Sequence, residues 1–448
     1  MSSVQVLTVS AAPGPLEGSV PVPSDEGVAL ARLAAAVLSR GESRVNVREP
    51  GAQIQTFLRL LEALGVEVRR AEDDVFVRGL GLTALPDYDE GLCLDLRGEV
   101  LVAGLALGLL AGRARSITIL CDETIRATLG ARLEQMGLGR LVTTAEGSGV
   151  QLAAIEGRPP GFDLQLTGLF PWEKQALLLL ALRASSKSRI IEGVLSPDHL
   201  ERVLFRARAP IQAESTWMEV HPPRDEDALA PSSYEFVGSM FVAGHLLLLP
   251  LLASAGGAVT VREVSTNRSA SDLPTLLKVL GADIEVQARG DRQGEPFADI
   301  TLRARGPLRG GFTLAGEQAT RLLDLSLPLL AALARGARPT LVTDLVCGQR
   351  DGSQDVVQRA AAYLLSAGAP VQLTEQGILV GGAPSSAKPL RVTTGGDRRL
   401  ALLGALLGSA SPEPSAIDDV ACLGEVFPRC AGTLRRLGAL ARVGPSEN

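Results

Sequence analysis

The stretch that decides the fold is Leu61-Glu62-Ala63-Leu64-Gly65-Val66-Glu67-Val68, where an apolar helical pattern ends at a glycine and a strand pattern begins. Glycine suits the residue that ends a helix at positive φ, and alternating apolar and polar residues are typical of a half-buried strand. A second alternating segment, Val75-Phe76-Val77, follows a short polar turn. The stretch therefore predicts a helix, a glycine turn and two strands joined by a turn.

Similar segments recur along the chain. They lie at 133–152, 209–220, 280–302, 367–380 and 437–443, and an apolar helix and a strand precede each one, as at 100–110 and 116–120. The period is roughly 65 to 80 residues, which is typical of a repeat whose units bury their apolar faces against neighbours. We therefore expect an α/β protein built from six units.

The sixth copy ends the chain without its second strand. The N-terminal segment 4–9 has a strand pattern and can supply the missing strand. Proline-rich segments at 12–15 and around 224–227 provide natural crossovers between domains. We therefore expect a first domain at 13–224 and a second domain made of 1–12 plus 225–448, each with three units.

The composition argues against several classes of protein. The chain has 44 basic and 50 acidic residues with no basic run, which disfavours a nucleic-acid partner. The longest apolar stretch, 237–252, is too short to span a bilayer, and the N-terminus lacks a signal-peptide pattern. Five cysteines without CxxC spacing and three scattered histidines predict no metal site. We expect a cytoplasmic protein without nucleic-acid or membrane partners.

Three local motifs occur in order along this repeat. They are 16–24 (LEGSVPVPS), 394–402 (TGGDRRLAL) and 422–428 (CLGEVFP). They resemble the Gly-x-x-x-x-Pro-Gly-Ser-Lys-Ser, Asp-His-Arg-x-Ala-Met and Cys-x-x-Lys-Ser-Phe-Pro motifs of the EPSP synthase (3-phosphoshikimate 1-carboxyvinyltransferase) family. The resemblance implies a two-domain inside-out α/β barrel of six βαβαββ units. It also implies transfer of the enolpyruvyl group of phosphoenolpyruvate to shikimate 3-phosphate, without a metal or organic cofactor.

The resemblance also implies which residues form the site. The substrate-binding candidates, which would form a remnant anion site between the domains, are Ser24, Arg97, Arg350, Asp397 and Arg399. The catalytic candidates are Asp324 and Asp355, since enolpyruvyl transfer needs groups that move protons. Asp355 and Asp397 each precede or begin an apolar helix, so helix capping is the alternative role for both. Helix capping likewise accounts for His199, and a core position accounts for His245.

Several positions depart from the family motifs. Glu26 and Glu425 stand where the family has lysines, Ala31 and Ala103 stand where it has arginines, and Pro171-Trp172-Glu173 replaces Ser-Ser-Gln. A cation ~4 Å from a substrate anion contributes about 4 kcal/mol at an effective dielectric constant of ~20, and a carboxylate reverses the sign. These replacements predict weak binding of phosphoenolpyruvate and shikimate 3-phosphate.

Two functional hypotheses remain open. In the first, the protein has lost enolpyruvyl transfer and acts as a binding or regulatory pseudoenzyme, with a small anionic metabolite between its domains or a protein partner. In the second, it is an active enzyme of the superfamily, either in the shikimate pathway or on a less anionic substrate. An arginine-rich cleft would favour the enzyme, and an apolar or acidic cleft would favour the pseudoenzyme.

Overall fold

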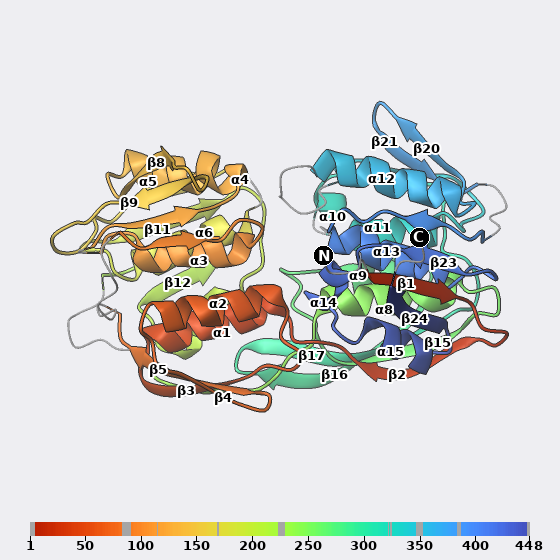
Figure 1. The fold of residues 1–448 in the computed structure, drawn as a ribbon, viewed down its shortest axis with the longest axis horizontal. Coiled ribbons are helices and arrows are strands. Elements are labelled where there is room, and N and C mark those ends of the chain that lie inside the picture. The colour runs from red at the N-terminus through yellow and green to blue at the C-terminus, as the bar shows by residue number, and fades with distance from the viewer. Residues whose placement is uncertain are drawn as a thin grey trace.

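A computed structural model describes residues 5–82, 91–113, 115–167, 170–222, 229–320, 322, 325–345, 353–382 and 387–445. Figure 1 shows two lobes side by side, with α1 to α7 in one and α8 to α15 in the other. Among these residues, no helix has the length and apolar character that crossing a bilayer requires. The expected two-lobed α/β architecture is confirmed.

The described residues form six four-stranded sheets, all with one topology. In each sheet the first and second strands are parallel, and the other neighbours are antiparallel, in the order first, second, fourth, third. A parallel pair needs a crossover connection, whereas the antiparallel pair can be joined by a short turn. This pattern matches the βαβαββ unit expected from the sequence.

Three sheets form the first lobe. In spatial order, their strands are β14 (Ser233–Tyr234), β3 (Arg40–Asn46), β5 (Asp74–Leu80) and β4 (Val68–Ala71); β6 (Cys93–Asp95), β7 (Ile117–Leu120), β9 (Ser148–Leu152) and β8 (Gly139–Thr143); and β10 (Asp163–Leu166), β11 (Ser188–Glu192), β13 (Trp217–Val220) and β12 (Ile211–Glu214). The helices are α1 (Glu26–Leu38), α2 (Ala52–Ala63), α3 (Val100–Leu110), α4 (Glu123–Ile125), the π-helix η1 (Arg126–Gly130), α5 (Ala131–Gln135), α6 (Pro171–Ala181) and α7 (His199–Arg206).

The other three sheets form the second lobe. Their strands are β2 (Leu16–Pro21), β15 (Gly257–Ser265), β17 (Glu295–Arg303) and β16 (Asp283–Arg292); β18 (Thr313–Leu314), β19 (Thr340–Val342), β21 (Gly377–Val380) and β20 (Val371–Thr374); and β22 (Arg391–Val392), β23 (Ser415–Ile417), β1 (Gln5–Ser10) and β24 (Leu440–Pro445). The helices are α8 (Met240–Leu252), α9 (Leu273–Val279), α10 (Glu317–Thr320), α11 (Ser326–Leu333), α12 (Ser353–Ser366), α13 (Arg398–Gly408), α14 (Ala421–Gly424) and α15 (Cys430–Arg436).

The N-terminal strand completes the sixth unit, as the sequence predicts. β1 lies between β23 and β24 and is antiparallel to both, with Leu7 opposite Ile417 on one side and Val443 on the other. It therefore takes the place of the fourth strand that the chain lacks at its C-terminal end. Leu7 and Val9 are completely buried in the second lobe.

The expected domain boundaries need correction because β2 and β14 each lie in the lobe to which the sequence did not assign them. β2, placed in the first domain by the sequence, pairs with β15 in the second lobe. β14, placed in the second domain, pairs with β3 in the first lobe. The buried apolar residues follow the same division, since one core draws on 29–234 and the other on 7–22 and 240–441. The crossovers therefore lie after β2 and after β14, rather than at residues 12 and 224.

The glycine turn also takes the expected conformation. Gly65 has φ = 74°, and the equivalent glycines of four other units are likewise at positive φ. The third unit has no glycine there, and Arg208 adopts φ = 63° instead. A side chain at positive φ is strained, so the repeat imposes this conformation even where the sequence does not favour it.

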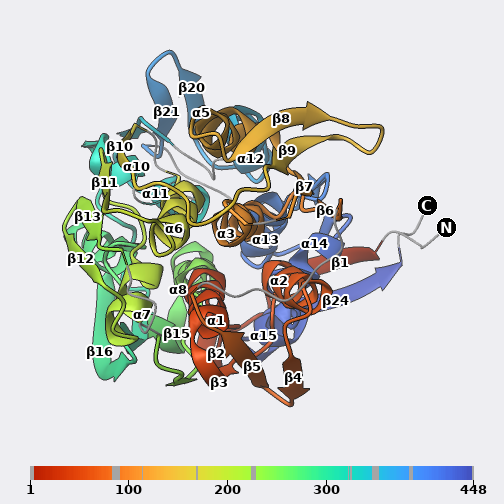
Figure 2. The same cartoon turned by 90° about the vertical axis from the view of Figure 1, so that its left-hand side faces the viewer.

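Apolar helices form the interior of each lobe, and the sheets lie outside them. Figure 2 shows α1, α3 and α6 in the middle of the first lobe with strands around them. Nearly every residue of α3 is buried, since the helix is apolar on all sides. Gly108 on α3 lets α6 approach closely, because a Cβ there would lie 2.5 Å from the carbonyl oxygen of Ala176. The central helices begin near the junction of the lobes, where a cavity lies.

Candidate functional site

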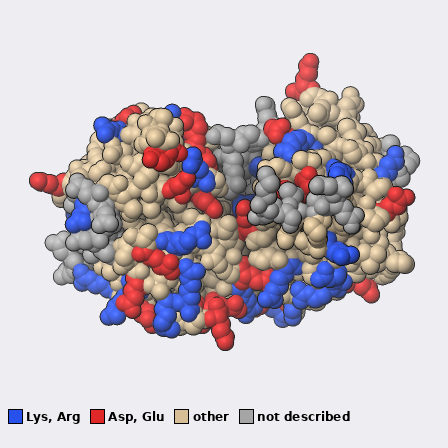
Figure 3. Space-filling view, in the orientation of Figure 1, with Lys and Arg blue, Asp and Glu red and all other residues tan. Residues whose placement is uncertain are grey.

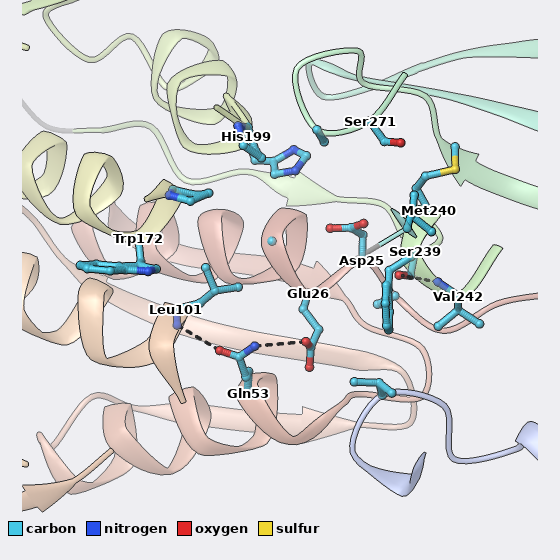
Figure 4. Close-up of a pocket in the computed structure, with 18 of the residues that line it drawn as sticks. Asp25, Glu26, Gln53, Leu101, Trp172, His199, Ser239, Met240, Val242 and Ser271 are labelled. Carbon is cyan, nitrogen blue, oxygen red and sulfur yellow. Dashed lines mark hydrogen bonds between the residues drawn. The ribbon is translucent and has the colours of Figure 1, made fainter. Parts of the chain in front are cut away.

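A cavity of about 260 Å³ lies between the two lobes. The first lobe contributes the starts of α1, α3, α6 and α7, and the second contributes the starts of α8 and α13 (Figure 4). Helix N-termini carry unpaired backbone N–H groups and favour negative charge nearby. The lining residues are Ser24, Asp25, Glu26, Gly27, Gln53, Val100, Leu101, Pro171, Trp172, Gln175, Pro197, His199, Ser239, Met240, Phe241, Val242, Ala270, Ser271, Leu322, Leu325, Arg398 and Val426.

Asp25 and His199 line the cavity, and Glu295 lies behind His199, so that the three form a buried ionisable cluster beside it. Asp25 caps α1, and its Oδ1 accepts a hydrogen bond of 3.1 Å from the backbone N–H of Val28. Nδ1 of His199, the first residue of α7, lies 3.2 Å from the Glu295 carboxylate of β17. His199 therefore connects the first lobe to the second. Figure 4 shows the side chains of His199 and Asp25 on the same side of the cavity.

Gly27 lets the His199 ring approach Asp25. A Cβ at Gly27 would lie 3.1 Å from Cδ2 and 3.4 Å from Nε2 of His199, and 3.4 Å from Oδ1 of Asp25. Among the described residues, Nε2 of His199 has no hydrogen-bond partner, whereas Nδ1 faces Glu295. The nitrogen on the cavity side is therefore available to a bound molecule.

The charges of this cluster displace its pKa values. Burial disfavours charge on His199, but the charge and hydrogen bond of Glu295 outweigh burial and raise the His199 pKa to about 9. Burial also raises the pKa of Asp25, and the charge of His199 offsets only part of that effect. For Glu295, burial is outweighed by His199, so its pKa is lowered. At neutral pH, His199 is therefore a proton donor, paired with the Glu295 carboxylate.

A polar network holds His199 in place. Asn267 donates from Nδ2 to Oδ1 of Asp198 at 2.7 Å and lies 3.4 Å from Nδ1 of His199. Ser269 donates to the same Asp198 oxygen at 2.7 Å, and Ser265 donates to Glu295 at 2.9 Å. Asp198 and His199 belong to the first lobe, and the three polar partners belong to the second. The network therefore fixes the ring and also joins the lobes.

Glu26 is the second carboxylate in the cavity. Its Oε2 lies 3.5 Å from Nη1 of Arg398 and accepts a hydrogen bond of 3.3 Å from Nε2 of Gln53. Gln53 in turn accepts from the backbone N–H of Leu101. Among the described lining residues, Arg398 is the one arginine or lysine. The charge of that arginine is thus directed at a carboxylate of the protein.

The sequence-derived binding residues lie in different places. Ser24 lines the cavity, and its hydroxyl accepts a hydrogen bond from the backbone N–H of Arg48. Asp397 caps α13 and pairs with Arg399 at 2.6 Å, and neither residue lines the cavity. Burial opposes ionisation of Asp397, but the hydrogen bonds and charge of Arg399 outweigh it and lower the Asp397 pKa. The capping role that the sequence offered for Asp397 agrees with this geometry.

Two further candidates lie away from the cavity. Arg97 pairs with Asp95 at the surface of the first lobe, and Asp355 is an exposed residue of α12 that lies 3.6 Å from Arg359. Asp324 and Arg350 lie outside the described residues. Glu425 does not line the cavity, although the next residue, Val426, does; the carbonyl oxygen of Glu425 accepts a hydrogen bond from the N–H of Ala52 at 2.7 Å.

The sequence pattern does not reveal the contact between His199 and Glu295. The Asp198-His199 pair at a helix start is typical of helix capping, and Glu295 belongs to an ordinary strand pattern. A lone histidine carries no signal of a partner 96 positions away. Among the described residues, no group of three or more potential ligands is arranged to hold a metal ion.

Comparisons with known proteins agree with the fold. The family model described as EPSP synthase (3-phosphoshikimate 1-carboxyvinyltransferase) matches residues 10–434. A 3-phosphoshikimate 1-carboxyvinyltransferase of Parvibaculum lavamentivorans is 29% identical over 441 residues, covering 95% of each chain. One of Desulfitobacterium hafniense is 27% identical over 419 residues, covering 93% of this chain and 94% of the relative.

Solved structures show the same architecture. An EPSP synthase from Acinetobacter baumannii has a TM-score of 0.82 at 21% identity, covering 98% of this chain and 100% of its own. The enolpyruvyl transferase NikO from Streptomyces tendae has a TM-score of 0.78 at 16% identity, covering 99% and 100%. The repeat, the sheet topology and the nearly full-length family match lead to one conclusion: this chain belongs to the EPSP synthase (3-phosphoshikimate 1-carboxyvinyltransferase) family.

Proposed function

We propose that this protein is an enolpyruvyl transferase whose acceptor is less anionic than shikimate 3-phosphate, and that Asp25 and His199 move the protons. The observation that supports the proposal is that Asp25 and His199 line the cavity while Glu295 pairs with His199 from behind. Ionisable groups with displaced pKa values in a cavity are typical of functional sites, because catalysis needs proton donors and acceptors matched to the working pH.

The two residues suit the two proton transfers. Enolpyruvyl transfer breaks the C–O bond to phosphate, forms a C–O bond to the acceptor and moves the acceptor's hydroxyl proton to the released phosphate. Asp25 as a carboxylate is the base for the hydroxyl. His199, with its pKa raised to about 9, is protonated at neutral pH and is the acid for the phosphate. Glu295 orients the ring through Nδ1 and stabilises its charge.

The charge of the cavity favours a neutral or cationic acceptor. Asp25 and Glu26 line it together with the apolar side chains of Leu101, Trp172 and Met240. A second phosphate placed ~4 Å from either carboxylate would be repelled by about 4 kcal/mol at an effective dielectric constant of ~20. An acceptor hydroxyl on an uncharged or positively charged molecule avoids that repulsion.

The test is phosphate release from phosphoenolpyruvate with a panel of hydroxyl acceptors, comprising shikimate 3-phosphate, shikimate, hydroxy amino acids and nucleosides. We expect kcat/KM for an acceptor without phosphate to exceed that for shikimate 3-phosphate by about tenfold or more. Asp25→Asn and His199→Gln should each lower kcat about 10²-fold or more. Asp355→Asn, an exposed carboxylate away from the cavity, should leave kcat unchanged. A preference for shikimate 3-phosphate, or full activity of Asp25→Asn, would contradict the proposal.

A second candidate function is binding without transfer, as in a regulatory pseudoenzyme. The charge pairing favours it, since Arg398 faces Glu26 and Arg399 faces Asp397. If this candidate is right, calorimetry should detect no binding of phosphoenolpyruvate or shikimate 3-phosphate. No acceptor of the panel should then cause release of phosphate from phosphoenolpyruvate. Micromolar binding of both compounds would exclude this candidate. If neither binds, the double variant Glu26→Lys/Glu425→Lys tests whether the two acidic positions are responsible.

A further inference from the structure

A second cavity lies on the second lobe and shares no lining residue with the cleft, although Val426 of the cleft and Phe427 of this cavity are consecutive in the chain. It is a groove of about 790 Å³ between α14, α15, β1 and β24. Four arginines line it, namely Arg429, Arg435, Arg436 and Arg442, and its described lining includes no aspartate or glutamate. We call it the arginine groove. No residue lines both this groove and the cleft cavity, so its function stands apart from the proposed transfer.

The charge of the arginine groove is largely uncompensated. Arg435, Arg436 and Arg442 form no ion pair with any described residue, and Arg429 alone is paired, at 3.3 Å from Glu49. Figure 3 shows Lys and Arg side chains gathered along the lower edge of this lobe, over the region of α15. The whole chain carries a formal charge of −6, so this is a local excess of positive charge and not a general property of the surface. Like charges held together repel, and a bound anion relieves that repulsion.

Hydrogen bonds to the protein hold two of the four arginine side chains in place but leave most of their N–H donors unused. Nη1 of Arg435 donates to the carbonyl oxygen of Ala441 at 2.8 Å, and Nη2 of Arg436 donates to Oγ1 of Thr433 at 3.2 Å. A guanidinium carries five N–H donors, so each retains several donors for another acceptor. An anchored guanidinium loses less conformational entropy on binding than a mobile one.

We propose that the arginine groove binds a small ligand that carries two or more phosphate groups. Phosphate oxygens accept paired hydrogen bonds from a guanidinium, and this bidentate geometry makes arginine the preferred partner for phosphates. The groove volume falls within the ~300–1,000 Å³ of small-molecule sites. Exposed apolar residues, namely Ala421, Pro428 and Val443, complete the lining, which suits a compact ligand with a nonphosphate part better than an extended polyanion.

Titration calorimetry of the full chain with inorganic tripolyphosphate tests the proposal. At ~0.1 M salt we expect one saturable site, weakened by added salt because its contacts are charged. The variant Arg435→Gln/Arg442→Gln should lose about tenfold or more in affinity. The control Arg78→Gln/Arg140→Gln removes the same charge from exposed strands of the first lobe and should bind as the wild type does. Circular dichroism verifies that both variants fold.

Two further variants distinguish binding in the arginine groove from binding in the cleft and from general attraction to positive charge. Asp25→Asn changes the cleft and should leave tripolyphosphate affinity unchanged, because the two cavities have no residue in common. Arg435→Lys/Arg442→Lys retains charge but loses the bidentate geometry and should bind more weakly than the wild type. Absence of saturable binding, or equal losses in the groove variant and the first-lobe control, would overturn the proposal.

Discussion

Nη1 of Arg398, the first residue of α13, lies 3.5 Å from Oε2 of Glu26, the first residue of α1. The two residues are 372 positions apart and belong to different lobes. Both side chains are only 16% exposed, so water screens their attraction less than at the surface. The ion pair therefore joins the lobes at the cavity. In it, Glu26 neutralises the positive charge of Arg398, which would otherwise attract a substrate anion.

Glu26→Lys should destabilise the protein, because it places two cations together in a half-buried site. We expect a loss of about 1–3 kcal/mol in the free energy of unfolding, measured by urea denaturation. Glu26→Lys/Arg398→Glu, which restores opposite charges, should regain most of it. Glu67→Lys is the matched control, since Glu67 also lies 3.5 Å from an arginine, Arg78, but both side chains are 69% exposed. The control should change stability by less than ~1 kcal/mol, and an equal loss there would contradict the prediction.

Lys174 on α6 should be far more important for stability than its position at a helix start suggests. Lysines at helix starts are usually solvated, but Lys174 is 1% exposed and lies 2.7 Å from Glu201 and 3.0 Å from Glu192. Lys174→Met leaves two carboxylates buried without their cation and should cost about 3–5 kcal/mol. Lys187→Met is the control, since that lysine lies 3.0 Å from Glu219 but is 56% exposed. Similar losses in the two variants would show that burial is not the cause.

Stability should depend on the protonation of His199. Its pKa rises from 6.5 to about 9 on folding, so the folded state binds its proton more tightly. That contribution is complete below about pH 6.5 and is lost as the pH rises toward about 9. The groups that face the ring are Glu295, Asp25 and Asp198, with Asn267 as a neutral partner.

Thermal unfolding across pH 6 to 10 measures this dependence. The melting temperature of the wild type should fall across the upper part of the range, whereas His199→Gln should show a flatter profile and a lower melting temperature at neutral pH. Glu295→Gln removes the main charged partner of His199 and should likewise reduce the fall of the melting temperature at high pH. Parallel profiles for the wild type and both variants would place the titrating group elsewhere.

Arg208→Gly should stabilise the protein. Arg208 has φ = 63° at the position where the other units have a glycine, and a side chain in this conformation costs roughly 1–2 kcal/mol. Removing the side chain relieves that strain, although a more flexible unfolded chain offsets part of the gain, so we expect about 0.5–1 kcal/mol by urea denaturation. The reciprocal change Gly65→Arg, at φ = 74°, should destabilise by a similar or larger amount. A loss of stability in Arg208→Gly would contradict the inference.

The candidate site is harder to predict from the sequence than the repeat is. Ser24 lies at the cavity as the family motif implies, whereas Asp397 and Arg399 pair with each other outside it. Local motifs place a residue on a loop or helix start, but they do not say which neighbour neutralises its charge. His199 and Glu295 come from separate lobes and have no common motif. Only their contact shows that the histidine is charged.

The sequence by itself determined the repeating unit. The helix-glycine-strand pattern, the buried apolar helices and the N-terminal strand that completes the sixth sheet all follow from local propensity and the two periods of helix and strand. Tertiary structure alone decided which lobe contains β2 and which contains β14, because each is short and its sheet partner lies far away along the chain. It also brought Asp25 and His199 to the cavity and placed Glu295 against His199. Local sequence sets the shape of each unit, whereas packing of the units against one another sets which charged side chains meet.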